Sequence, residues 1–465
     1  MSSRMPALPQ RLWLLAIGVA SLLLAPLAQA EPETFETRLG NGMKVIVRPD
    51  HRAPVVMSQV WYRIGSVDEF NGTTGLSHVL EHMMFKGTTK VPSGEFSRRV
   101  AAAGGKENAF TSRDHTVYHQ QIAARHLPLV LELEADRMRN LVLDEAEFKK
   151  EIQVVMEERR WRIEDQPGSQ VYETMMGTAL QAHPYRIPVI GYMDDLRNLT
   201  IDDVRAWYKR WYAPNNATLV VVGDVEPDAV VKLAQKFFGP LEPSVLPVRK
   251  PQNEPTQAGI RRVRVKAVAE EPTVTMAWRA PLLTDPEHDW MPYALDVLAG
   301  VLDGYPGARL KTHLVREQRI AVDVDAGYDG IGRGPALFMV GGAPAPGHSV
   351  DDLEAALREQ IKRIADDGVK PEELARARSQ VIAGQVFARD SISAQASMIG
   401  QLESAGLGHR TEALLLQKIH DVTAAQIQQV ARELLVDDSL TVAVLDPQPM
   451  PAGGKPKGPP RGMRH

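Results

Sequence analysis

The sequence predicts a layered α+β or α/β fold that is divided into two parts. Strand patterns alternate with segments of helical periodicity along the first 240 residues, which is typical of sheets covered by helices. Five prolines between residues 239 and 258 then interrupt the pattern, as expected of an interdomain linker. Beyond them a strand followed by a long helix begins the order again, which indicates a faint internal duplication.

The elements of the first part follow one another closely. A hairpin with a turn at residues 40–42 is predicted within residues 34–47. Further predicted strands cover residues 55–64, 116–122 and 218–222, and predicted helices cover residues 74–86, 93–103, 126–139, 145–164 and 201–210. The second part contains a predicted strand over 273–278, a helix over 290–302 and a final strand over 440–445.

The first thirty residues have the pattern of an export signal. Two arginines flank the start of a mostly apolar run over residues 12–27, and Ala-Gln-Ala at 28–30 fits a cleavage site with small residues. We expect a mature chain that begins near Glu31 and is located in the periplasm. A retained membrane anchor is the alternative, although the run is short for a span and Pro26 interrupts it.

Composition excludes several classes of function. A net charge of −4 gives no electrostatic basis for nucleic-acid binding. The absence of cysteine excludes a disulfide framework, a lipoprotein attachment site and a cysteine nucleophile. No later run is long and apolar enough to span a membrane. Residues 449–465 contain glycine, proline and basic residues without an apolar period, and we expect them to be disordered.

The sharpest chemical signal is His-Val-Leu-Glu-His at residues 78–82. In a helix His78 and His82 lie one turn and about 40° apart, so both imidazoles can bind one ion. Glu81 lies about 60° to the other side of His78, where it can reach a water molecule without binding the metal. Zinc suits imidazole and carboxylate ligands with one open position. The order is the inverse of the commoner His-Glu-x-x-His motif. Thr73 or Thr74 is the expected N-cap of this helix.

A catalytic zinc needs a third ligand, and the predicted helix over 145–164 offers carboxylates. Asp144 and Glu147 have the spacing of a capping box at its start. Glu151 and Glu158 border its apolar stripe and point partly inward, where carboxylates are costly unless paired or bound to metal. The residues alone leave open whether Glu158 binds the metal or pairs with Arg162 one turn later.

Two other patterns are weaker. His115 and His119 are also four residues apart, but in a strand that separation is about 13 Å, too far for one metal. The glycine-rich stretch over residues 330–334 lacks the strand–helix context of a phosphate-binding loop.

Several short motifs, taken together, resemble a known family. They are Leu39-Gly-Asn-Gly-Met-Lys-Val45, Gly65-Ser-Val-Asp-Glu69, Gly75-Leu-Ser-His-Val-Leu-Glu-His-Met-Met-Phe-Lys-Gly-Thr88, Gly104-Gly-Lys-Glu-Asn-Ala-Phe-Thr111, His183-Pro-Tyr185, Tyr212-Ala-Pro-Asn-Asn-Ala217 and Val222-Gly-Asp224. The chain resembles the pitrilysin/insulinase superfamily of inverted-motif zinc peptidases, and most closely its short bacterial branch that is similar to mitochondrial processing peptidase. The resemblance extends over nearly all of the mature chain.

The resemblance implies a site and an architecture. It places the third zinc ligand at Glu158, with one zinc per chain, and a supporting carboxylate at Glu151. It implies that Asn108 and Ala109 lie on an edge strand that pairs with the substrate backbone. It also implies two similar α/β-sandwich domains, at residues 31–240 and 259–448 with a linker at 241–258, which form half of a clam-like chamber.

One departure from the family concerns the second part. In double-length members of the family, and in some partner subunits, the C-terminal half supplies an arginine and a tyrosine that contact the substrate. Arg316 is present, but the tyrosine position falls on Val322 or Asp323, and Tyr328 lies nearby. We therefore expect a dimer, formed either with a second copy or with a metal-free sister subunit that has the intact arginine and tyrosine pair.

The expected function is zinc-dependent endopeptidase action on peptides or short unfolded proteins. Glu81 is the expected general base. The alternative is a non-catalytic scaffold or assembly subunit of the same fold. Such relatives have broken metal motifs, whereas the four residues of the motif set are intact in this chain.

Overall fold

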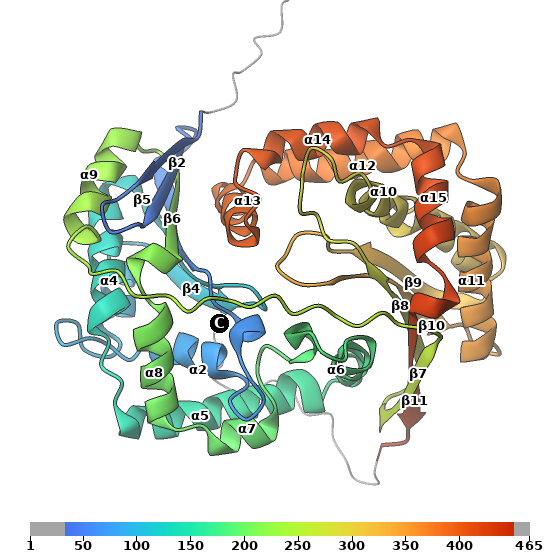
Figure 1. Ribbon diagram of the computed structural model, residues 1–465, viewed down its shortest axis with the longest axis horizontal. Coiled ribbons are helices and arrows are strands. Elements are labelled where there is room, and N and C mark those ends of the chain that lie inside the picture. Colours follow the sequence, from blue (N-terminus) through green and yellow to red (C-terminus); the bar gives the residue numbers. More distant parts are fainter. Residues whose placement is uncertain (1–32, 451–465) are drawn as a thin grey trace, which may run out of the picture.

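The computed structural model describes residues 33–450 and shows two halves, each built on one β-sheet (Figure 1). The predicted signal peptide at residues 1–30, and residues 451–465 of the predicted tail, lie outside the described residues. Between residues 33 and 450, no helix has the length and apolar character needed to cross a membrane.

The first half contains six strands and the helices that cover them. Its strands are β1 (Phe35–Arg38), β2 (Lys44–Pro49), β3 (Val55–Tyr62), β4 (Lys106–Thr111), β5 (Thr116–Ala123) and β6 (Ala217–Gly223). Its α-helices are α2 (Leu76–Met83), α3 (Glu95–Ala102), α4 (Leu127–Asn140), α5 (Glu145–Arg159), α6 (Pro167–Ala179), α7 (Met193–Asn198), α8 (Ile201–Trp211) and α9 (Pro227–Phe237). A π-helical turn, η3 (Arg160–Glu164), continues α5.

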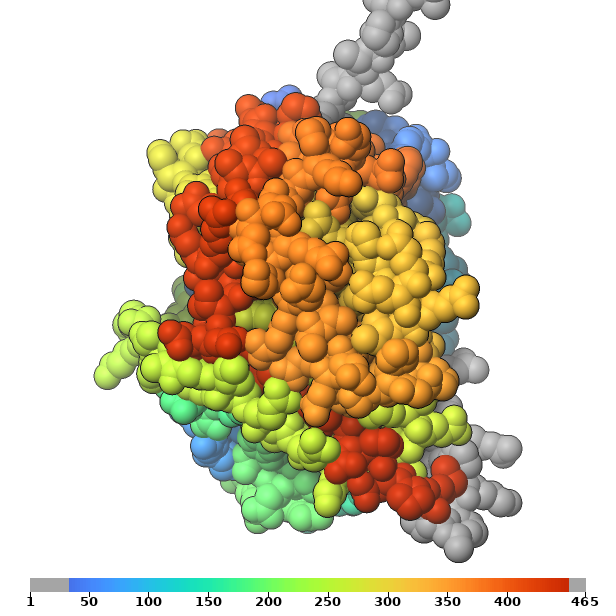
Figure 2. All heavy atoms as spheres, turned by 90° about the vertical axis from the view of Figure 1, so that its right-hand side faces the viewer, coloured from blue at the N-terminus to red at the C-terminus, as the bar shows by residue number. Residues whose placement is uncertain are grey.

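The second half contains five strands and six α-helices in its described residues. Its strands are β7 (Arg261–Val268), β8 (Thr273–Ala280), β9 (Ala321–Tyr328), β10 (Ala336–Pro344) and β11 (Leu440–Gln448). Its helices are α10 (Met291–Asp303), α11 (Val350–Asp367), α12 (Pro371–Ala388), α13 (Ile392–Ala405), α14 (Thr411–Asp421) and α15 (Ala424–Leu434), with a π-helical turn η6 (Lys311–Glu317). The outer face on the right-hand side of Figure 1, which faces the viewer in Figure 2, consists mostly of the second half, coloured yellow to red.

Both sheets are mixed. The first has the order β1-β2-β6-β3-β5-β4, in which only β2 and β6 run parallel to each other, and β4 forms one edge. The second has the order β7-β11-β8-β10-β9, in which only β11 and β7 run parallel. Each sheet packs on a large apolar core formed with helices of its own half. The predicted α+β fold with two similar parts is confirmed.

Each sheet is also covered by a helix from the opposite half (Figure 1). Helix α6 of the first half packs on β7 and β11, with Met175 and Leu180 in a shared apolar cluster. Helix α13 of the second half packs on β3 and β6, with Ile399 and Trp61 in a shared apolar cluster. The approach is so close that a Cβ on Gly400 would lie 1.9 Å from Trp61 Cε2. The two halves are therefore interlocked.

Most predicted segments correspond to observed elements, but several elements of the structure are additional. The hairpin at 34–47 and the strands and helices predicted up to residue 164 are present, with α5 changing to η3 at Arg160. The predicted segments do not include α6, α7 or α9 in the first half. The prolines between residues 239 and 258 lie in a segment without helix or strand that runs across the molecule from α9 to β7 (Figure 1).

Candidate metal centre

Helix α2 carries the His-x-x-Glu-His motif, and all eight of its residues are buried. Its first turn is capped differently from the prediction. The cap residue is Gly75, at φ 85°, and the carboxylate of Glu69 accepts the N–H groups of Gly75 and Ser77, both at 2.7 Å. Thr74, one of the two expected caps, instead donates its hydroxyl to Asp195 at 2.6 Å. The N-cap prediction was wrong because the Glu69 carboxylate, and not a threonine hydroxyl, accepts the N–H groups at the start of the helix.

Glu69 is an acid buried at the start of helix α2. Burial raises its pKa to about 7, although the two helix N–H groups act in the opposite direction. A negative charge at this position is also favoured by the positive end of the helix dipole. Glu69 therefore fixes the start of the helix that presents the histidines, a contribution that its position in the Gly65–Glu69 motif does not reveal.

Helix α5 brings the third ligand to α2. Asp144 caps it by accepting the N–H groups of Ala146 and Glu147, at 2.8 and 3.0 Å. The second hydrogen bond of the predicted capping box, from the Asp144 N–H to the Glu147 side chain, is not formed. The Glu147 carboxylate pairs with Lys150 instead, at 2.7 Å. The predicted apolar stripe of α5 is buried, and it turns Glu158 toward the histidines with 1% of its side chain exposed.

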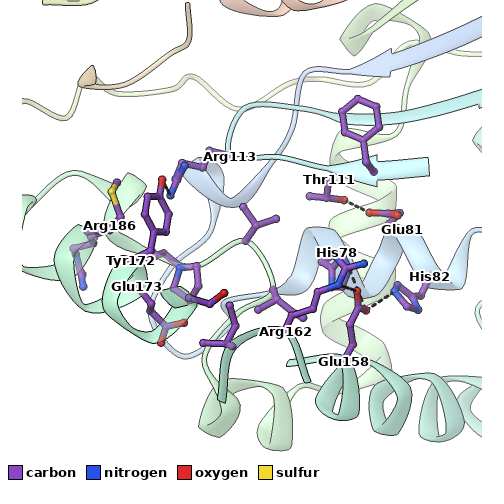
Figure 3. A pocket seen from close by; sticks show the side chains of 18 of the residues that line it. His78, Glu81, His82, Thr111, Arg113, Glu158, Arg162, Tyr172, Glu173 and Arg186 are labelled. Atoms are coloured by element: carbon purple, nitrogen blue, oxygen red, sulfur yellow. Dashed lines mark hydrogen bonds and ion pairs between the residues drawn. The ribbon is translucent and has the colours of Figure 1, made fainter. Parts of the chain in front are cut away.

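Three side chains meet at the centre of the site (Figure 3). Glu158 Oε2 lies 3.4 Å from His82 Nε2 and 3.7 Å from His78 Nε2. Ligand atoms at about 2.1 Å from a tetrahedral zinc lie about 3.4 Å from one another. Two imidazole nitrogens and one carboxylate oxygen at this spacing fit a zinc ion that keeps one open position. The other oxygen of Glu158 accepts from Arg162 at 2.8 Å, so the pair with Arg162 forms while Oε2 stays directed toward the histidines.

A second carboxylate supports His82 from behind. Glu151 Oε2 lies 3.3 Å from His82 Nδ1, and Glu151 Oε1 pairs with Lys86 at 2.5 Å. This contact holds the Nδ1 proton and leaves Nε2 directed toward Glu158, as in many metal sites. Burial lowers the pKa of His82, but hydrogen bonds to Glu151 and Glu158 outweigh burial and raise that pKa to about 9. The carboxylates thus give the site an affinity for positive charge.

Glu81 lies beside the metal set and is held by the edge strand. Its Oε2 accepts a hydrogen bond of 2.5 Å from the Thr111 hydroxyl at the end of β4. Burial raises the pKa of Glu81, and the hydrogen bond from Thr111 acts against this shift. Thr111 is part of a quoted motif, but no pattern in the sequence assigns it this contact, which depends on the packing of α2 against β4.

The site opens into a cavity of about 640 Å³. All four motif residues line it, and so do Asn108 and Ala109 of the edge strand. Asn108 is paired with His119 of β5, so the opposite edge of β4 has no neighbouring strand in the sheet. The far end of the cavity is formed by η3, α6 and residues 186–190 (Figure 3).

Other predicted residues lie elsewhere. Arg316 is in η6 and donates to the carbonyl of Pro306 at 2.6 Å, so it does not line this cavity. Val322 is exposed on the edge strand β9, while the Tyr328 hydroxyl donates to the carbonyl of Pro281. His115 packs against Trp61, with ring centroids 4.6 Å apart.

Comparison with known families gives matches to both halves. A family model described as insulinase, peptidase family M16, matches residues 44–192. A second, described as peptidase M16 inactive domain, matches residues 198–381.

Relatives and solved structures agree with these matches. The chain is 33% identical over 360 residues to zinc protease PqqE of Helicobacter pylori, covering 75% of this chain and 80% of the relative. It is 27% identical over 432 residues to a probable mitochondrial-processing peptidase subunit beta of Arabidopsis thaliana, covering 90% and 79% of the two chains. The crystal structure of a protease from Helicobacter pylori matches with a TM-score of 0.84 and 29% identity, over 90% of this chain and 100% of that one.

Proposed function

The chain belongs to the insulinase family, peptidase family M16, and from this premise we propose that it is an active zinc-dependent endopeptidase. Its substrates are peptides or short unfolded proteins. The observation that carries the proposal is that His78, His82 and Glu158 converge while Glu81 lies beside them in the same cavity. A single zinc ion per chain is the expected cofactor.

The reaction uses residues of α2, α5 and β4. Zinc, when held by His78, His82 and Glu158, supplies Lewis-acid polarisation of the peptide carbonyl and makes water more acidic. Glu81 takes the proton of the attacking water on Oε1, because Oε2 is occupied by the Thr111 hydroxyl. The same carboxyl then delivers that proton to the leaving amine. Glu151 keeps His82 in the orientation that presents Nε2.

The substrate backbone binds along the edge of β4. An edge strand offers unpaired N–H and C=O groups to an extended peptide, which then adds one strand to the sheet. Asn108 and Ala109 lie at the middle of β4 and line the catalytic cavity. A peptide paired there passes next to Glu81, so its bound geometry brings one peptide bond to the catalytic residues.

Assembly and location complete the proposal. We propose a dimer that closes a chamber around the substrate, with a second copy or a metal-free sister subunit as the partner. The sister subunit is favoured because Arg316 has no tyrosine at position 322 or 323 beside it. The predicted signal at residues 1–30 implies a periplasmic enzyme that begins near Glu31.

A non-catalytic scaffold is the alternative, and the metal and the peptidase rate together distinguish the two. The purified protein is expected to hold zinc and to hydrolyse a peptide library, whereas Glu81→Gln keeps zinc and loses about two to four orders of magnitude in rate. Activity is measured for the chain alone and with the candidate sister subunit. A zinc-loaded protein whose hydrolysis is unchanged by Glu81→Gln, or absent in both preparations, would contradict the proposal.

A further inference from the structure

The end of the catalytic cavity that lies away from His82 carries two guanidinium groups, those of Arg113 and Arg186 (Figure 3). Arg113 follows β4 directly and donates to the Tyr185 carbonyl and the Tyr172 hydroxyl, both at 3.2 Å. Arg186 donates to the side-chain oxygen of Asn71 at 3.3 Å. Among residues 33–450, neither arginine has a carboxylate oxygen within 4.0 Å. Both positive charges are therefore held by neutral partners.

One of these groups has an unused donor. The Nε atom of Arg186 is buried and makes no hydrogen bond within the described part of the chain. A buried guanidinium N–H without an acceptor is costly, and a carboxylate is the acceptor that guanidinium binds most strongly. Arg186 lines the cavity, so a carboxylate bound at this end would meet a guanidinium group that has no anionic partner among residues 33–450.

The carboxylates in the same cavity do not neutralise this end. Glu173 lines it but forms two hydrogen bonds with Arg159, at 2.9 and 3.0 Å. Glu158 is shared between Arg162 and the two histidines. The local charge balance near Arg113 and Arg186 is therefore positive.

Much of the remaining wall is apolar, which strengthens electrostatic attraction by keeping water away. It is formed by Ile163, Met176, Ile187, Pro188, Val189 and Ile190. A mostly apolar pocket with a few fixed polar groups is the usual form of a selective binding site. The Tyr172 ring, 5.7 Å from the Arg113 guanidinium carbon, holds that arginine in place.

We propose that Arg113 and Arg186 form a carboxylate subsite, which selects peptides with an acidic side chain or a C-terminal carboxylate close to the cleaved bond. This inference rests on the proposed peptidase function. Arg113 is two residues beyond Thr111, so the subsite lies along the same line as a peptide paired with β4. A peptide with lysine at this position meets two like charges and binds poorly.

The first experiment uses the wild-type zinc protein and one cleaved parent peptide. Each of the three residues on either side of the cleaved bond is changed in turn to Glu, Gln or Lys, and kcat/KM is measured. At one position Glu is expected to exceed Gln by about ten- to a hundredfold, the usual advantage of a charged hydrogen bond, and Lys is expected to be slowest. A parallel set of C-terminally amidated peptides shows whether a terminal carboxylate is the preferred group.

The variants then assign the preference to the two arginines. In Arg113→Gln and in Arg186→Gln the Glu-to-Gln ratio is expected to fall toward one, and in Arg113→Glu the Lys peptide is expected to become preferred over Glu. Arg160→Gln is the matched control: Arg160 pairs with Glu157 outside the cavity, so the ratio stays at its wild-type value. Equal rates for the Glu, Gln and Lys peptides, together with equal rates for free and amidated ends, would overturn the subsite while leaving the peptidase function intact. Absence of any cleavage would instead count against that function.

Discussion

Replacing Arg333 by glutamine is expected to loosen the contact between the two halves next to the substrate strand. Arg333 lies in the loop between β9 and β10, and its guanidinium forms two hydrogen bonds with Asp68, at 2.9 and 3.0 Å. It also donates to the Asp114 carbonyl at 3.0 Å. Asp114 belongs to the turn that follows β4, so this contact joins the second half to the edge strand of the first.

The magnitude follows from burial and from the partners that remain. The side chains of Arg333 and Asp68 are 9% and 5% exposed, and removing one partner of a buried ion pair costs about 3–5 kcal/mol. Asp68 keeps a hydrogen bond of 2.6 Å from Arg249, so we expect the lower limit, about 3 kcal/mol. That energy corresponds to roughly a hundredfold in the equilibrium for opening this contact.

Hydrogen exchange measures this opening at each amide. In Arg333→Gln the amides of residues 112–115 and 329–334 are expected to lose about two orders of magnitude of protection. Arg48→Gln is the control. It also breaks a pair between the halves, with Glu412 at 2.6 Å, and it also leaves that carboxylate a second arginine, Arg389 at 3.3 Å. Its effect is expected at α14, with the 112–115 turn unchanged. Wild-type protection of both loops in Arg333→Gln would refute the reasoning.

Three further predictions concern the metal and the fold. His78→Ala and His82→Ala are each expected to lose zinc in metal analysis, because two remaining ligands hold it weakly; full occupancy in both would contradict the assignment. Glu151→Gln is expected to weaken zinc affinity by about 10–100-fold while Glu157→Gln, on the exposed side of α5, leaves it unchanged. Residues 31–240 expressed alone are expected to aggregate, because α13 no longer covers β3 and β6; a monodisperse, zinc-binding fragment would show otherwise.

Local patterns predicted helix α2 and the convergence of His78, His82 and Glu158. The spacing of His78 and His82 requires only helical geometry, and the apolar stripe of α5 orients Glu158 without knowledge of the rest of the fold. For this reason a set of residues separated by more than seventy positions could be assigned with the help of the family resemblance.

Contacts between segments that are distant in the sequence could not be predicted from these local patterns. Glu69 caps α2, and Thr111 holds Glu81, only because the tertiary fold brings them together. Helix α6 contains Gly168, Gly177 and several hydroxyl residues with weak helix propensity, and it is stabilised by packing on the other half. The glycines at 330–334 are explained by close approach: a Cβ on Gly334 would lie 2.3 Å from His183 Cε1.

The second half has no His-x-x-Glu-His motif of its own, yet it forms part of the scaffold of the proposed catalytic site. Helix α13 covers the sheet that β4 completes, and Arg333 holds the turn after β4. Because Thr111 at the end of β4 orients Glu81, whatever fixes β4 also fixes the proposed base. A shift of about 1 Å in such a group can cost about a hundredfold in rate. Residues far from the reacting atoms in the second half are therefore expected to affect catalysis through the position of this one strand.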